Sequence, residues 1–197
     1  MCSSEHRSPQ LLQVVGRFTS EKIKNITITG MGIALFVVLT LCLQVPVFEN
    51  YYLCLGYIVM AMYLYSIGTI SGTIVGTLGV ILYCVLINGL RGMPGWALAN
   101  VVIGIILGLT FKATKKLHRP WLATLINVIS IVIGTAIGIL IFKSGLECIL
   151  YAQPFLVRTA NNIYAFIADI VVLIVALPVC KLMDGILMKT GITKKKE

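Results

Sequence analysis

The chain has 197 residues, of which 58% are hydrophobic and only 12% charged, and its mean hydropathy is +0.98. Soluble domains carry about 25% charged residues, so a water-soluble enzyme of this length could not bury so much apolar side chain. The excess predicts an all-α membrane protein, with room for about six crossings of roughly 20 residues each. Such a chain leaves no large extramembrane domain to carry a separate activity.

The apolar segments predict six transmembrane helices joined by short polar or glycine-rich connections. Residues 1–24 form a basic cytoplasmic head with a juxtamembrane segment, residues 25–190 the membrane domain, and residues 191–197 a basic cytoplasmic tail. The expected spans cover approximately residues 26–43, 53–67, 71–87, 96–111, 121–142 and 161–183.

Three connections have distinct compositions. Residues 66–72 lack charge and contain two glycines, which predicts a tight turn or a broken helix after the short second span. Residues 88–95 hold three glycines and Pro94 and predict an ordered loop at the membrane surface. Residues 143–158 predict a polar connection before the last span.

The distribution of charge predicts the orientation. The chain has 16 basic residues against 7 acidic ones, a net charge of +9. If both termini are cytoplasmic, 13 basic residues lie inside and three lie outside, namely Arg91, Lys143 and Arg158. Positive charge concentrates in cytoplasmic loops, so we expect N and C termini inside, and basic residues that contact lipid headgroups rather than nucleic acid.

Residues for catalysis or cofactor binding are missing from the sequence. It contains two histidines, His6 and His118, both in basic segments, and it has no phosphate-binding loop and no Cys/His cluster with metal-ligand spacing. We therefore expect no enzyme activity, no catalytic residue, no cofactor and no metal, and any ATP hydrolysis must occur on other chains.

Polar and aromatic residues concentrate toward the predicted outer side. If they converge, they form a small-molecule site with aromatic walls and a few hydrogen-bonding groups. The other interpretations are an interfacial belt for the aromatic residues and an interhelical hydrogen bond for Asn100. The candidate substrate-binding residues are Tyr51, Tyr52, Asn88, Arg91, Trp96, Asn100, Glu147, Arg158, Asn162 and Tyr164.

Asp169 lies deeper, seven residues after Asn162 on the same helical face. An ionisable group in a span is a functional candidate, so Asp169 is either a proton or ion site or a structural acid. Small residues four apart, such as Gly104 and Gly108, favour close helix packing. Gly30 and Ala34 on the first span serve either such packing or the docking of another membrane subunit.

One long stretch of the chain suggests a family. Residues 50–83, NYYLCLGYIVMAMYLYSIGTISGTIVGTLGVILY, followed at 90–108 by LRGMPGWALANVVIGIILG, resemble the S components of energy-coupling factor (ECF) vitamin transporters. The resemblance covers roughly residues 25–190 and rests on the pattern of spans and glycine-rich junctions. Members of that family carry a small-residue AxxxA stripe on the first helix, and the matching residues here are Gly30 and Ala34.

The resemblance implies a substrate-binding subunit in a bacterial plasma membrane that captures a water-soluble vitamin or precursor. Pantothenate and a pyridoxine or hydroxymethylpyrimidine type of ring are the two candidate substrates. The implied partners are a transmembrane coupling (T) subunit, contacted through Gly30 and Ala34, and two ATPase (A) subunits. The alternatives are an ion- or proton-coupled secondary transporter that uses Asp169, and a non-transporting membrane assembly subunit.

Overall fold

A computed structural model provides the structure of the chain. It describes residues 8–43, 45–48, 51–87, 89–90 and 92–189, with the backbone alone described for 8–21, 45–48, 51–52 and 188.

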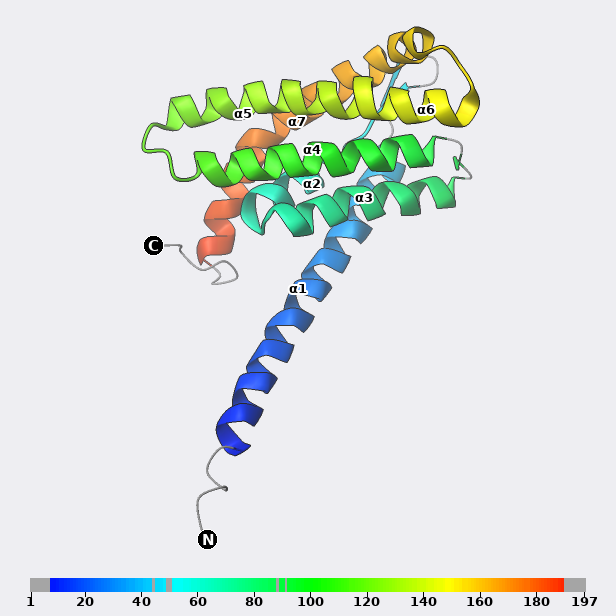
Figure 1. Cartoon of the computed structure of the whole chain (residues 1–197). Helices are drawn as coiled ribbons and strands as arrows, with labels where there is room; N and C mark the ends of the chain where they lie inside the picture. The colour runs from blue at the N-terminus through cyan, green and yellow to red at the C-terminus, as the bar shows by residue number, and fades with distance from the viewer. Residues whose placement is uncertain (1–7, 44, 49–50, 88, 91, 190–197) are drawn as a thin grey trace.

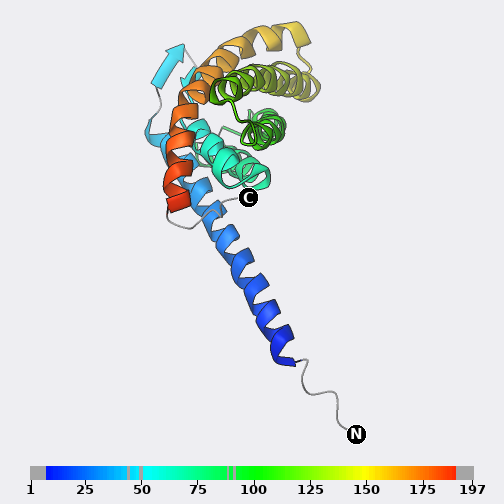
Figure 2. The same cartoon turned by 90° about the vertical axis from the view of Figure 1, so that its left-hand side faces the viewer.

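The described part is a bundle of helices with one short β-hairpin (Figure 1). Helices α3, α4 and α5 lie side by side, α7 crosses them, and the N-terminal half of α1 projects away from the bundle (Figures 1 and 2). The elements are α1 (Ser8–Cys42), β1 (Val45–Phe48), β2 (Tyr51–Leu53), α2 (Gly56–Ser66), α3 (Thr69–Leu86), α4 (Met93–Thr114), α5 (Pro120–Thr135), the π-helix η1 (Ala136–Lys143), α6 (Ser144–Tyr151) and α7 (Phe155–Lys189).

The helical membrane fold is confirmed, with five helical segments in the described residues that are long and apolar enough to cross a membrane. The second expected span corresponds to α2, which has 11 residues and is too short for a full crossing by itself. The five segments are Lys22–Cys42, Thr69–Leu86, Met93–Thr114, Pro120–Tyr151 and Phe155–Leu187.

The expectation of an all-α fold misses the hairpin. Its strands pair antiparallel, with Val45 opposite Leu53 and Pro46 opposite Tyr52. The expected tight turn between α2 and α3 is present, and it depends on Gly68, whose φ of +146° is a conformation that side chains with a Cβ rarely adopt.

The expected polar connection at residues 143–158 is wrong over its first half. The helix of α5 continues through η1 and α6 to Tyr151. Lys143 and Glu147 do not end the helix because they face the protein: Lys143 lines a cavity and Glu147 is buried. In this stretch Ser144 donates its hydroxyl to the carbonyl of Ile139, five residues earlier, at 3.2 Å.

Glycines let the helices approach closely. A Cβ on Gly72 would lie 2.5 Å from the backbone nitrogen of Leu64 in α2, and Gly104 and Gly108 face threonines of α3. Gly30 behaves differently, because a Cβ there would meet nothing within 4 Å, and Ala34 is exposed one turn later. The small-residue stripe of α1 therefore faces away from the bundle.

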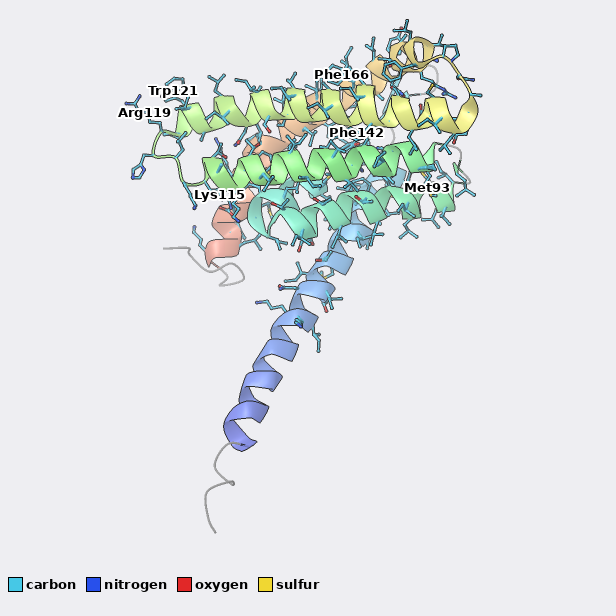
Figure 3. The ribbon with its side chains drawn as sticks, viewed as in Figure 1. Met93, Lys115, Arg119, Trp121, Phe142 and Phe166 are labelled. Atoms are coloured by element: carbon cyan, nitrogen blue, oxygen red, sulfur yellow. The ribbon has the colours of Figure 1, made fainter. Side chains whose placement is uncertain are left out.

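The two ends of the bundle differ in charge. Lys115, Arg119 and Trp121 lie at one end and Met93 at the other (Figure 3). At the basic end, Lys115 Nζ forms an ion pair of 2.8 Å with Asp184 Oδ1, which ties the end of α4 to α7.

Candidate functional site

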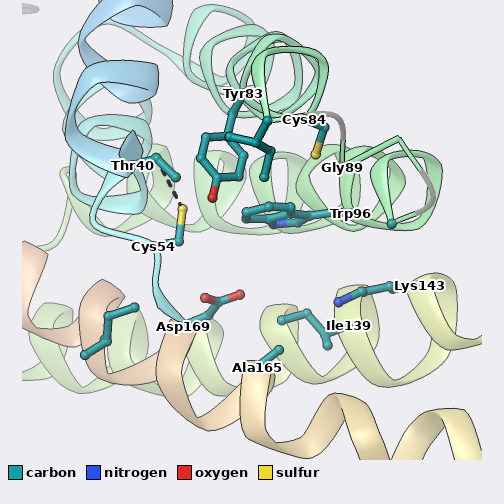
Figure 4. A pocket seen from close by; sticks show the side chains of 13 residues that line it. Thr40, Cys54, Tyr83, Cys84, Gly89, Trp96, Ile139, Lys143, Ala165 and Asp169 are labelled. Atoms are coloured by element: carbon teal, nitrogen blue, oxygen red, sulfur yellow. Dashed lines mark hydrogen bonds between the residues drawn. The ribbon is translucent and has the colours of Figure 1, made fainter. Parts of the chain in front are cut away.

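A cavity of about 300 Å³ lies inside the bundle, bordered by α3 and α4 on one side and by η1 and α7 on the other (Figure 4). We call it the central cavity. Its volume is at the small end of the range for ligand pockets. It is lined by Thr40, Leu53, Cys54, Tyr83, Cys84, Ile87, Gly89, Gly92, Trp96, Ile139, Lys143, Ala165 and Asp169.

Trp96 forms an aromatic wall of the central cavity. Its ring packs edge-on against Tyr83, with ring centroids 5.8 Å apart and an interplanar angle of 83°. Its indole Nε1 donates a hydrogen bond of 2.9 Å to the hydroxyl of Tyr57. The two contacts fix the indole from α3 and from α2, so that it presents a rigid apolar surface to the cavity (Figure 4).

Asn100 supports this wall from behind. The Tyr57 hydroxyl donates to Asn100 Oδ1 at 2.7 Å, and Asn100 Nδ2 donates to the carbonyl of Gly76 at 2.8 Å. Asn100 and Tyr57 are both fully buried. A buried polar group left without a partner would be costly, so this chain of hydrogen bonds joins α2, α3 and α4 at one defined register.

The opposite wall carries two charged side chains. Lys143 reaches the central cavity from η1 and Asp169 from α7, and the two side chains point into the same space (Figure 4). Asp169 is 6% exposed. At the α1 side of the cavity, Thr40 Oγ1 contacts Cys54 Sγ at 3.5 Å and donates to the carbonyl of Phe36.

A second, more open space of about 460 Å³ lies next to the central cavity, and we call it the polar hollow. Gly92 lines both spaces. In the hollow, Glu147 Oε2 accepts a hydrogen bond of 3.2 Å from Asn162 Nδ2 and lies 3.9 Å from a guanidinium nitrogen of Arg158. The hollow is lined by Gly92, Glu147, Tyr151, Gln153, Arg158 and Asn161.

The candidate residues from the sequence separate into groups. Trp96 lines the central cavity, Glu147 and Arg158 line the polar hollow, and Asn100 and Asn162 support the two walls. Tyr164 is 44% exposed and lines neither space.

The remaining candidates cannot be assigned to either space. Asn88 and Arg91 lie outside the described residues. Tyr51 and Tyr52 lie in β2, and only the backbone of these two residues is described.

Lys143 and Tyr83 line the central cavity but are not among the candidate site residues predicted from the sequence. Lys143 follows an apolar segment and precedes Gly145, a pattern typical of a span end, and the π-helical winding that turns it inward leaves no clear mark in the sequence. A single tyrosine in an apolar span, as at Tyr83, is equally typical of the interface. Asp169 was singled out, but as either a proton or ion site or a structural acid, and not as part of a substrate site.

Comparison with known proteins agrees with the resemblance in the sequence. The model of the family "ECF-type riboflavin transporter, S component" matches residues 20–184, most of the chain. A UPF0397 protein of Streptococcus thermophilus is 29% identical over 158 residues, covering 73% of this chain and 84% of the relative. A UPF0397 protein of Lactobacillus helveticus is 27% identical over 183 residues, covering 89% and 96%. No solved structure matches the chain.

Proposed function

Because the chain belongs to the ECF-type riboflavin transporter S component family, we propose that it captures a water-soluble vitamin or precursor in its central cavity and delivers it inward. Its family and its five apolar helical segments make it a multi-pass membrane protein and a transporter subunit rather than an enzyme. The family also implies, in general, a vitamin substrate and T and A subunits as partners.

The observation that carries the proposal is the central cavity with its fixed indole. A cavity of about 300 Å³ with an aromatic wall and a few polar groups has the size and composition of a small-molecule site. Trp96 is held from two helices before any ligand arrives, so little conformational freedom is lost when a ring packs against it.

We propose that the substrate enters through the polar hollow, which faces outside. Gly92 supports this route, since it lines both the hollow and the central cavity and carries no side chain that could obstruct a passage at this point. The 13-to-3 asymmetry of basic residues supports cytoplasmic termini. With α2 and the hairpin counted together as a sixth, incomplete crossing, both termini lie on one side in the bacterial plasma membrane.

We further propose that Gly30 and Ala34 contact the T subunit, and that two A subunits hydrolyse ATP. Support comes from the outward orientation of this stripe, where a Cβ on Gly30 meets nothing within 4 Å. Met31 and Leu35 on the same helix are 67% and 44% exposed. An exposed face of small and apolar residues on a membrane helix allows close approach of a second helix.

The test is to purify the chain gently from its native host and identify what co-purifies by mass spectrometry. We expect one vitamin to co-purify in stoichiometric amount and to bind again after it has been removed from the protein. Reconstitution in vesicles should then give uptake only with the T and A subunits and ATP. Absence of any small-molecule binding would overturn the proposal in favour of an assembly subunit.

One observation favours a second candidate, a secondary transporter. Asp169 is a buried acid that lines the central cavity, which is where a coupling proton or ion would bind. Uptake by the chain alone, driven by an ion gradient without ATPase subunits and abolished by Asp169→Asn, would select this candidate.

A further inference from the structure

The central cavity contains one positive and one negative side chain that do not pair. Lys143 and Asp169 are both described and both line the cavity, yet they form no ion pair with each other. By contrast, Lys115 and Asp184, at the basic end of the bundle, approach to 2.8 Å. The two charges therefore do not neutralise each other by direct contact, and both line the space that a ligand would occupy (Figure 4).

The protein offers the carboxyl group of Asp169 a single shared hydroxyl, which leaves most of its acceptor positions open. The hydroxyl of Tyr57 lies near its carboxyl group, but Tyr57 donates its proton to Asn100 and accepts from Trp96. Among the described residues, the Tyr57 hydroxyl is the one side-chain hydrogen-bond partner of Asp169, and its single proton is directed to Asn100. A 94% buried carboxylate aimed into a cavity is thus left for a donor that comes with the ligand.

The arrangement of charges discriminates between classes of ligand. A simple anion would pair with Lys143 but would be repelled by Asp169. A simple cation would pair with Asp169 but would be repelled by Lys143. A neutral apolar ligand would remove water from both groups without replacing it, and desolvation of unpaired charges is costly. Only a ligand with opposite polarity at two edges satisfies both groups.

The facing wall restricts the shape of that ligand. The indole of Trp96 lies across the cavity from Lys143 and Asp169, with Tyr83 beside it (Figure 4). Flat rings stack or pack edge-on against such a surface. The volume of about 300 Å³ favours a compact ligand over a long one.

We infer that the substrate is a compact heteroaromatic ring with dipolar edges: an anionic or strongly accepting edge binds Lys143, and a protonated or amino nitrogen at the opposite edge binds Asp169. This inference rests on the proposed function and narrows its substrate class. It also makes Lys143 and Asp169 specificity-determining residues.

The experiment uses the fluorescence of Trp96. The chain contains two tryptophans, and Trp121 is exposed, so Trp121→Phe leaves a single reporter in the cavity. The purified full chain with this substitution is titrated with four probes: pyridoxine, 4-amino-5-hydroxymethyl-2-methylpyrimidine, pantothenate and riboflavin. We expect a dipolar or amino-substituted ring, one of the first two, to bind at least about tenfold more tightly than pantothenate or riboflavin.

Substitution of each charge then tests the contacts. Lys143→Gln and Asp169→Asn should each weaken the preferred ring by about tenfold or more, the size expected for a lost charge-assisted hydrogen bond. Lys115→Gln and Asp184→Asn, which remove the same charges outside the cavity, should leave its affinity unchanged. If either cavity variant fails to fold, Lys143→Arg or Asp169→Glu replaces it, with reduced affinity expected because the charge is displaced.

Two outcomes separate this inference from the proposed function. If riboflavin or pantothenate binds most tightly, and if its affinity is unaffected by the Lys143 and Asp169 substitutions, the dipolar-ring inference is overturned. The proposed function would still stand. No fluorescence response to any probe, together with no co-purifying small molecule, would overturn both.

Discussion

The indole nitrogen of Trp96 lies 2.9 Å from the hydroxyl oxygen of Tyr57, and this hydrogen bond ties the wall of the central cavity on α4 to the short helix α2. Tyr57 also donates to Asn100. One hydroxyl therefore sets both the orientation of the indole and the register of the helix that carries it.

Tyr57→Phe should weaken binding of the co-purifying ligand by about 3- to 30-fold, because the indole loses an acceptor worth about 1 kcal/mol and a neighbouring amide loses its donor. Equilibrium titration of the emptied protein measures the effect. Tyr65→Phe on the same helix is the control, since that ring packs against Phe111 and Lys115 away from the cavity. An unchanged dissociation constant for Tyr57→Phe would contradict the positioning role.

Asn100→Leu should lower the free energy of unfolding by about 1–3 kcal/mol, because the Tyr57 hydroxyl and the carbonyl of Gly76 are left buried without their partner. Thermal or denaturant unfolding in detergent gives the difference. The exposed Asn161→Leu provides the comparison, and equal stabilities for the two variants would show that the buried amide is not structurally important.

The sequence predicted most of the helices because apolar segments of membrane length have few other uses. It also named Trp96 and Asn100 as candidate site residues, and the structure has both in α4, with Trp96 lining the central cavity and Asn100 behind it. It overestimated the length of α2, because apolar composition does not distinguish a full membrane crossing from an 11-residue helix buried against its neighbours.

Contacts between distant elements could not be predicted. Nothing in the local sequence brings Lys143 opposite Trp96, because that meeting depends on how η1 packs against α4. Glu147 and Asn162 were grouped by their expected side of the membrane. Their hydrogen bond, however, depends on the helix of α5 continuing through η1 and α6, past the end of the expected fifth span. Three-dimensional packing, rather than composition, decides these positions.

Gly92→Phe should slow ligand association and dissociation by about tenfold or more while changing the dissociation constant little. A side chain there obstructs the connection between the polar hollow and the central cavity, and a Cβ at this position meets nothing within 4 Å. Stopped-flow fluorescence of Trp96 measures both rates. Gly145→Phe, where a Cβ also finds open space, is the matched control; equal rates for the two variants would exclude this entry route.

Ala34→Trp should leave ligand binding intact and abolish ATP-driven uptake by the reconstituted complex, because a large side chain on the exposed stripe of α1 prevents close approach of the T subunit. Binding by the purified chain and uptake in vesicles are measured in parallel. Leu125→Trp on the exposed face of α5 should support normal uptake. Loss of ligand binding in Ala34→Trp would instead assign the stripe to the internal structure of the chain.

The π-helical segment η1 has a consequence for both spaces. Eight residues wound more loosely than an α-helix rotate everything that follows relative to α5, and in an α-helix one residue corresponds to about 100° of rotation. Lys143 ends this segment, and Glu147 lies one turn beyond it. Deleting a single residue here would rotate Lys143 away from the central cavity and Glu147 away from the polar hollow at the same time. The winding of η1 therefore sets the direction of both side chains.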